Sequence, residues 1–188
     1  MEKTINSWPS SVCLLITGLP GSAKSTLVEK LKNKWPDNTA FINADWVRKF
    51  ISTDLDFSVE SKLTQARRLG QLAAMAFTNS YPRICVVECW SALADSRFEF
   101  ALEFSKTFEF LNRSTKSSRL PHLIHVHMDT IDWTQSKYPI QEHEYERPSD
   151  LEVDFRISTF PTSKLADSFF TSLKARINEL DRKITNSK

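Results

Sequence analysis

A short segment near the N-terminus has the residue types and spacing that bind phosphate groups. Residues 18–26 read Gly-Leu-Pro-Gly-Ser-Ala-Lys-Ser-Thr, which follows the P-loop pattern G-x-x-x-x-G-K-[ST] except that Ala23 takes the place of the last glycine. In such a loop, successive backbone N–H groups point at phosphate oxygens beside the positive end of a helix. We therefore expect nucleotide contacts from the loop residues Gly18, Gly21, Ser22, Ala23, Lys24, Ser25 and Thr26.

Two side chains of this loop have separate chemical roles. Lys24 supplies a mobile cation for the β- and γ-phosphates, and the hydroxyl of Ser25 can ligate Mg²⁺. Alanine is the smallest replacement for glycine, and we expect Ala23 to be tolerated with a negative φ. The loop therefore predicts ATP and Mg²⁺ as the bound groups.

Two carboxylates follow predicted strands and are candidates for catalysis. Asp45 comes just after residues 40–43 and could orient or deprotonate a substrate hydroxyl; as a structural alternative, it could cap the next helix. Glu88 ends residues 84–87 and could hold Mg²⁺ through water, serve as the base, or be a satisfied carboxylate at a strand end. Which of the two acids is the base stays open at this stage.

Strands must alternate with helices to position these groups. Short apolar runs predict strands at 12–17, 40–43, 84–87 and 123–128, with a short last one at 151–157. Helical spacing predicts helices at 25–35, 46–50, 58–77, 97–110 and 163–184. This order predicts an α/β protein: a three-layer α/β/α P-loop nucleoside triphosphate hydrolase fold with a mainly parallel five-stranded sheet, in one domain over residues 1–188.

The composition excludes several classes of function. The formal net charge of the 188 residues is +2, so nucleic acid is not an expected partner. No run of 20 apolar residues occurs, so no membrane span is expected. Three cysteines without a C-x-x-C pattern favour buried, reduced thiols and a cytoplasmic location over a metal site. The alternating His122, His125 and His127 are typical of packed or hydrogen-bonded strand residues rather than of metal ligands. Whether the protein forms a homodimer stays open.

Several blocks, in chain order, resemble the adenylylsulfate kinase family, whose members transfer the γ-phosphate of ATP to the 3′-hydroxyl of adenosine 5′-phosphosulfate. Residues 18–26 are similar to its G-L-x-G-x-G-K-S-T, residues 43–48 to its D-G-D-N-V-R, and residues 54–58 to its D-L-G-F-S. Residues 127–130 and 145–148 resemble its V-x-V-D-T and P-Y-E-x-P. The likeness covers about residues 10–160, and it implies ATP, Mg²⁺ and a role in sulfate assimilation.

The resemblance also implies roles for the acceptor side of the site. It implies a catalytic role for Asp45, substrate binding by Arg48, and stacking of Phe57 on the adenine of the acceptor. Gln65 stands at the last position of the family's D-R-x-E-N motif, which grips the phosphosulfate side of the acceptor. Trp90, just past a predicted strand, could form a wall for an aromatic acceptor.

The chain departs from the family at three places. Asn43 replaces the first acid of D-G-D, and residues 61–65 differ from D-R-x-E-N. The lid-like segment at about 131–150 is shortened, with Lys137 as the one cation between residues 131 and 144. Catalysis then needs a cation from elsewhere, for which Arg97, Arg147 and Arg156 are the candidates.

We therefore expect a kinase: an ATP-dependent phosphotransferase that moves the γ-phosphate to a small-molecule hydroxyl, with adenosine 5′-phosphosulfate as the leading acceptor. The altered residues 61–65 keep open another acceptor, such as a nucleoside, a sugar or a modified base. Ala23, Asn43 and the short lid keep open a nucleotide-binding regulatory module with little transfer.

Overall fold

The computed structural model describes residues 10–78, 84–91, 93–113, 119–136, 140 and 144–186, without the side chain of Trp133. The strands are β1 (Val12–Gly18), β2 (Ala40–Asn43), β3 (Ile84–Glu88), β4 (His122–Met128) and β5 (Phe155–Ile157). The helices are α1 (Lys24–Leu31), α2 (Ala44–Phe50), α3 (Val59–Met75), α4 (Ala94–Leu111) and α5 (Ser163–Thr185), with short 3-10 turns η1 (Lys32–Lys34) and η2 (Trp133–Gln135).

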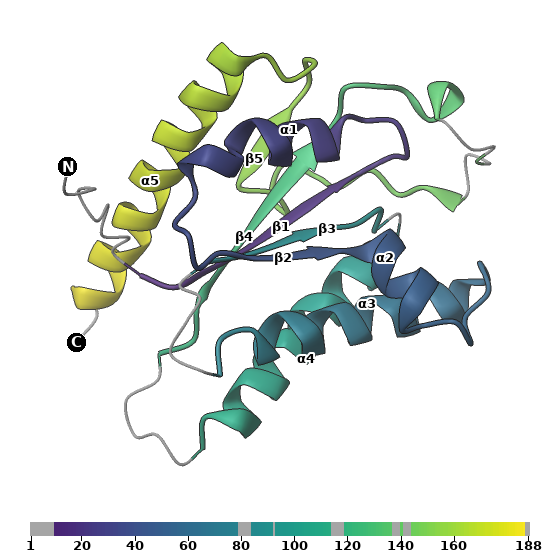
Figure 1. Ribbon diagram of the computed structural model, residues 1–188, viewed down its shortest axis with the longest axis horizontal. Helices are drawn as coiled ribbons and strands as arrows, with labels where there is room; N and C mark the ends of the chain where they lie inside the picture. The colour runs from purple at the N-terminus through teal and green to yellow at the C-terminus, as the bar shows by residue number, and fades with distance from the viewer. Residues whose placement is uncertain are drawn as a thin grey trace.

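The strands form one parallel five-stranded sheet in the order β2-β3-β1-β4-β5. Helices α1 and α5 cover one face of the sheet and α3 and α4 cover the other, with α2 beside the end of β2 (Figure 1). The predicted fold class is therefore confirmed.

Each face of the sheet has its own apolar core, because successive side chains of a strand point to opposite faces. Leu14 and Ile16 of β1 pack in the core that includes α1 and α5. Cys13 and Leu15 pack in the core that includes α3 and α4. All seven residues of β1 are buried, which is why this strand reads as a nearly continuous apolar run.

Several predicted elements differ from the sequence expectation in length, and α4 and β5 differ most, by four residues each. α4 begins at Ala94, three residues earlier than its apolar spacing indicates. β5 is limited to three residues rather than seven. Residues 151–154 stay outside the strand, where hydrogen bonds of their side chains hold the segment: the Glu152 carboxylate accepts from Ser149 N at 2.6 Å, and the Asp154 carboxylate accepts from His125 N at 3.0 Å.

The longest helix, α5, is amphipathic and lies over the sheet. Its buried side chains are Ala166, Phe169, Leu173 and Ile177. Within the described ranges, no helix has the length and apolarity needed to cross a bilayer.

The strand register brings the predicted functional residues to one edge. Gly18 is level with Met128, and Asn43 is level with Glu88. Since all the strands are parallel, their carboxyl ends meet along this edge, where open α/β sheets bind ligands.

Candidate functional site

The phosphate loop curls around its own lysine between β1 and α1. The Lys24 ammonium donates to the carbonyl oxygens of Gly18 and Leu19, both at 2.8 Å. Burial lowers the pKa of Lys24, whereas the negative charges of Glu88 and Asp45 act in the opposite direction. A Cβ on Gly18 would lie 2.6 Å from the Met128 carbonyl oxygen, so this close approach requires glycine.

Ala23 contradicts the expectation of a negative φ. Its φ is 64° and its ψ is 27°, in the left-handed region. The prediction was wrong because the loop reverses its direction at this residue to enter α1, and that turn fixes the conformation whatever the side chain. A residue with a Cβ is strained in this conformation by about 1–2 kcal/mol.

The two residues predicted to hold Mg²⁺ are in direct contact. The Ser25 hydroxyl, at the start of α1, donates to the Glu88 carboxylate at the end of β3. Hydroxyl and carboxylate oxygens fit Mg²⁺, which usually keeps several waters and adds phosphate oxygens to one or two protein ligands. The described residues contain no cluster of three His, Cys, Asp or Glu side chains suited to a metal, and such a cage is not what Mg²⁺ requires.

Asp45 lies in the first turn of α2, and it does not cap that helix. The cap is Asn43, whose side-chain oxygen accepts from the backbone N–H groups of Asp45 at 3.0 Å and Trp46 at 3.1 Å. The capping interpretation of Asp45 is therefore wrong, because an Asn two residues earlier already satisfies those donors. The Asp45 carboxylate is exposed and close enough to Lys24 to influence its pKa.

On the acceptor side, Arg48 and Phe57 lie together. The Arg48 guanidinium is 5.0 Å from the centre of the Phe57 ring and donates to the Asp56 carbonyl oxygen at 2.6 Å. Phe57 is 70% exposed, so its ring is available for stacking. These contacts bring together two of the four predicted acceptor residues.

The other two acceptor residues, Gln65 and Trp90, are more enclosed. Gln65 is buried, and its amide donates to the Ala44 carbonyl oxygen at 3.2 Å, which ties α3 to the start of α2. Trp90 is half-buried, with the Lys62 ammonium 5.1 Å from its ring. The Gln65 side-chain oxygen and the Trp90 indole N–H are buried without a hydrogen-bond partner in the described part of the chain.

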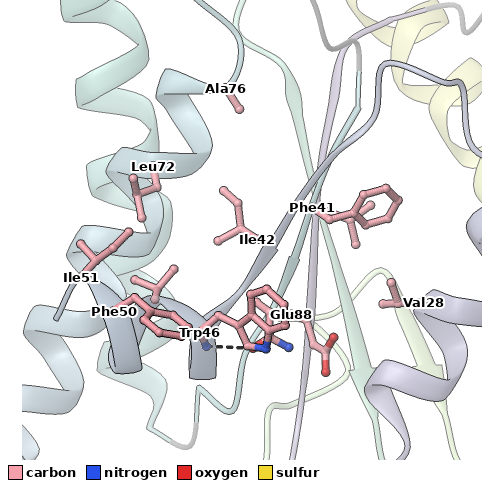
Figure 2. A pocket seen from close by; sticks show the side chains of 12 residues that line it. Val28, Phe41, Ile42, Trp46, Phe50, Ile51, Leu72, Ala76 and Glu88 are labelled. Carbon is pink, nitrogen blue, oxygen red and sulfur yellow. Dashed lines mark hydrogen bonds between the residues drawn. The ribbon is translucent and has the colours of Figure 1, made fainter. Parts of the chain in front are cut away.

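A pocket of about 680 Å³ runs along the outer edge of β2 and touches the site at Asn43, Trp46 and Glu88. Figure 2 shows Phe41 and Val28 on one side of this edge and Ile42, Leu72 and Ala76 on the other. The pocket is therefore an apolar groove along the side of the sheet, and only one of its ends reaches the edge where the carboxyl ends of the strands meet.

Buried histidines link the base of the phosphate loop to Tyr145. Thr17 Oγ1 lies 2.7 Å from His125 Nε2 and 2.9 Å from His127 Nδ1, and His127 Nε2 lies 2.9 Å from the Tyr145 hydroxyl. The expectation of hydrogen-bonded strand histidines is confirmed. Sequence reasoning missed Thr17 and Tyr145, although two alternating histidines in a central parallel strand signal a need for buried polar partners.

The direction of each bond in this network follows from one acceptor. His125 Nδ1 lies 2.9 Å from the Glu152 carbonyl oxygen, which can only accept, so Nδ1 carries the proton. In neutral His125, Nε2 then accepts from Thr17, whose oxygen in turn accepts from His127 Nδ1. The Tyr145 hydroxyl therefore donates to His127 Nε2. Burial lowers the pKa of both histidines, and that of His127 to about 3, which keeps them neutral.

The three candidate arginines differ in exposure and in their partners. Arg97 is buried and bonds the carbonyl oxygens of Ser91 and Glu146. The side chain of Arg156 is 18% exposed, and that of Arg147 is 61% exposed. Lys137, the predicted lid cation, lies outside the described residues.

Known proteins resemble the chain in sequence and in fold. Residues 10–117 match the family profile described as Adenylylsulphate kinase. The chain is 40% identical over 68 residues to an adenylyl-sulfate kinase of Thermodesulfovibrio yellowstonii, covering 35% of this chain and 34% of the relative. It is 30% identical over 88 residues to a probable adenylyl-sulfate kinase of Aeropyrum pernix, covering 45% and 44%. The chain therefore spans less than half of the length of these relatives.

Solved structures share the fold at lower identity. The Mycobacterium tuberculosis APS kinase CysC, in complex with AMPPNP and APS, aligns with a TM-score of 0.64 at 20% identity, over 88% of this chain and 99% of its own. A gluconokinase from Sinorhizobium meliloti aligns with a TM-score of 0.54 at 14% identity, over 94% and 98%. Because the family profile matches more than half of the residues, in the segment that holds the phosphate loop, Asp45 and Glu88, the chain belongs to the adenylylsulphate kinase family.

Proposed function

We propose that the protein is an ATP-dependent kinase that transfers the γ-phosphoryl group to the hydroxyl of a small molecule, with adenosine 5′-phosphosulfate as the leading acceptor. The observation that carries this proposal is the contact of Ser25 with Glu88, beside the lysine of the phosphate loop. Family membership and Asp45 on the adjacent helix support it.

The proposed reaction assigns one task to each of these side chains. The acceptor oxygen forms a bond to the γ-phosphorus, and the bond from that phosphorus to the bridging oxygen breaks, so ADP leaves with the electron pair. Asp45 accepts the proton of the acceptor hydroxyl. Lys24 stabilises the charge on the transferring group. Ser25 and Glu88 would hold Mg²⁺, which would supply positive charge against the phosphates.

The choice of acceptor rests on side chains of the site rather than on the fold. Arg48 and Phe57 form a cation and an exposed ring that suit an adenine-containing anion. A gluconokinase has the same fold, however, so the fold alone does not select the acceptor. Another hydroxyl acceptor and a regulatory module with little transfer remain the competing proposals.

The test is acceptor-dependent release of ADP. The protein is incubated with ATP, Mg²⁺ and a panel that contains adenosine 5′-phosphosulfate, nucleosides and sugars. We expect release with adenosine 5′-phosphosulfate and a loss of at least ~100-fold in kcat/KM for Lys24→Ala. Lys30→Ala, an exposed lysine of the same helix, is the matched control and should stay within about twofold. ATP binding without transfer to any acceptor would instead support the regulatory module.

We further propose one kinase domain with a shortened lid-like segment at about 131–150, working in the cytoplasm. Cys13, Cys85 and Cys89 are buried and unbridged, which suits a reducing compartment.

We also propose that the groove along β2 binds a second copy of the chain. Four of its side chains are 46% to 70% exposed: Phe41, Trp46, Phe50 and Ile51. Together they offer roughly 500 Å² of apolar surface, which matches the apolar share of an interface that buries about 800 Å² on each partner. Sedimentation should give the mass of a dimer for the wild type and of a monomer for Phe50→Glu. Phe98→Glu, at a phenylalanine of α4 that is 65% exposed, should remain dimeric.

A further inference from the structure

The residues that follow β4 lie against the phosphate loop. Met128, the last residue of β4, is level with Gly18, and the Thr130 hydroxyl donates to the Ser22 carbonyl oxygen at 2.9 Å. Asp129 lies between Met128 and Thr130 along the chain. The Arg147 guanidinium donates to the Asp129 carboxylate, so this contact ties a cation to the segment that touches the loop.

The backbone around Arg147 is fixed by hydrogen bonds on both sides. The contacts are those of the Tyr145 hydroxyl with His127 at 2.9 Å, the Glu146 carboxylate with Ala94 N at 2.6 Å, the Glu146 carbonyl oxygen with Arg97 at 3.0 Å, and the Pro148 carbonyl oxygen with Arg156 at 2.6 Å. The residues on both sides of Arg147 are therefore held in place, whereas its side chain is 61% exposed.

The other two arginines lack this freedom. Arg97 is 7% exposed and bonds the Glu152 carboxylate at 3.0 Å in addition to two carbonyl oxygens. Arg156 bonds the Pro148 carbonyl oxygen, the Asp150 carboxylate at 2.9 Å and the Asp129 carboxylate at 3.4 Å. Moving either guanidinium would break several contacts at once.

Arg147 can leave Asp129 without leaving a lone buried charge. Asp129 has Arg156 as a second partner, so its carboxylate stays paired after Arg147 moves away. An ion pair with an exposed partner contributes little to stability. A phosphate group offers the planar guanidinium a more highly charged, bidentate partner.

We propose that Arg147 is the cation that contacts the γ-phosphate of ATP, and that its guanidinium rests on Asp129 in the free protein. The shortened lid leaves this role open, and Arg147 could fill it from a segment whose neighbouring residues are held by hydrogen bonds. The contact with the γ-phosphate requires only ATP binding, whereas its effect on transfer rests on the proposed kinase function.

The first test compares ATP with ADP, since only ATP has the γ-phosphate. Calorimetry with Mg²⁺ should show that Arg147→Ala lowers the affinity for ATP at least ~10-fold and changes the affinity for ADP less than about twofold. Arg147→Lys should keep part of the ATP affinity, because lysine retains the positive charge but cannot form the bidentate hydrogen bonds of a guanidinium. Asp129→Asn should raise the affinity for ATP relative to that for ADP, because it removes the carboxylate on which Arg147 rests in the free protein.

The control for this test is Arg119→Ala. Arg119 also pairs with an aspartate, Asp181 at 3.1 Å, but it lies just before the opposite end of β4. This variant should bind both nucleotides within about twofold of the wild type. Equal weakening of ATP and ADP in Arg147→Ala, or no change in either, would overturn the proposal.

The second test measures transfer, once an acceptor is identified. Arg147→Ala should lower kcat by about 100- to 1000-fold, as expected for a lost cation at a transferring phosphoryl group. A variant that keeps the wild-type kcat would overturn the catalytic role. If the wild type transfers phosphate to no acceptor, the kinase proposal fails, but the comparison of ATP with ADP still decides the role of Arg147.

Discussion

Ala23 occupies the left-handed region at the point where the phosphate loop enters α1. Glycine reaches this region at almost no cost, whereas a Cβ there is strained. The loop keeps its shape nonetheless, because neighbouring contacts determine it: Ser22 N donates to the Leu19 carbonyl oxygen at 3.0 Å, and the Lys24 ammonium bonds two loop carbonyls. Strain stored at a binding loop is a known feature of functional sites.

Replacing Ala23 with glycine should stabilise the protein. We expect Ala23→Gly to raise the free energy of unfolding by about 1 kcal/mol in urea denaturation, because it removes the strain. The matched change Ala101→Gly, in the right-handed backbone of α4, should instead lower it by about 0.5–1 kcal/mol. A loss of stability in both variants would contradict the account of the loop.

At the scale of elements, α3 and α4 approach each other closely at Gly70. A Cβ built on Gly70 would lie 2.5 Å from the Phe100 carbonyl oxygen and 3.0 Å from the Phe104 nitrogen, both in the backbone of α4. This contact closes the core that supports β3 and Cys89. The position of Glu88 at the end of β3 therefore depends on the fit of two helices that lie behind the site.

Gly70→Ala should destabilise the protein although alanine is the better helix former. The gain in helix propensity is about 1 kcal/mol, and the overpacking costs about 1–3 kcal/mol, so we expect a net loss of roughly 1 kcal/mol. Urea denaturation measures this loss, and Gln71→Ala on the exposed side of α3 should stay within about 0.5 kcal/mol of the wild type. A net gain in Gly70→Ala would show that the helices can separate easily.

At the scale of the whole molecule, the neutral histidine network joins β1, β4 and the segments around Tyr145 and Glu152. Burial lowers the pKa of His127 from its ordinary 6.5 to about 3. The unfolded chain therefore binds a proton near pH 6.5 that the folded chain does not bind until about pH 3. The stability that neutral His127 contributes is therefore present in full above pH 6.5 and is lost as the pH falls toward 3.

Lowering the pH from 7 to 5 should therefore reduce the free energy of unfolding, by about 2 kcal/mol from His127 alone. His127→Gln cannot take up this proton, so it should be less stable at pH 7 but lose about 2 kcal/mol less between the two pH values. Urea denaturation at both pH values measures the difference. An equal loss in the wild type and the variant would mean that His127 titrates normally in the folded protein.

The sequence predicted most elements of the fold well, because each depends on neighbours along the chain, whereas the roles of the donor-side residues stay predictions. A β-branched apolar run, a glycine and a lysine at fixed spacing determine the strand and the turn of residues 12–26 locally. Parallel pairing of β1 with β3 then sets Ile16 level with Glu88 and brings Glu88 to Ser25.

Other features were decided only by the tertiary structure. They include the sign of φ at Ala23, the cap at Asn43, the burial of Gln65 and the exposure of the three arginines. Most of these depend on groups that are distant in sequence, as when Glu146 and Glu152 hold the buried Arg97. The sequence alone therefore determined the phosphate-binding chemistry of this protein, while through-space contacts decided how each side chain is held, because exposure and hydrogen-bond partners exist only once the chain has folded.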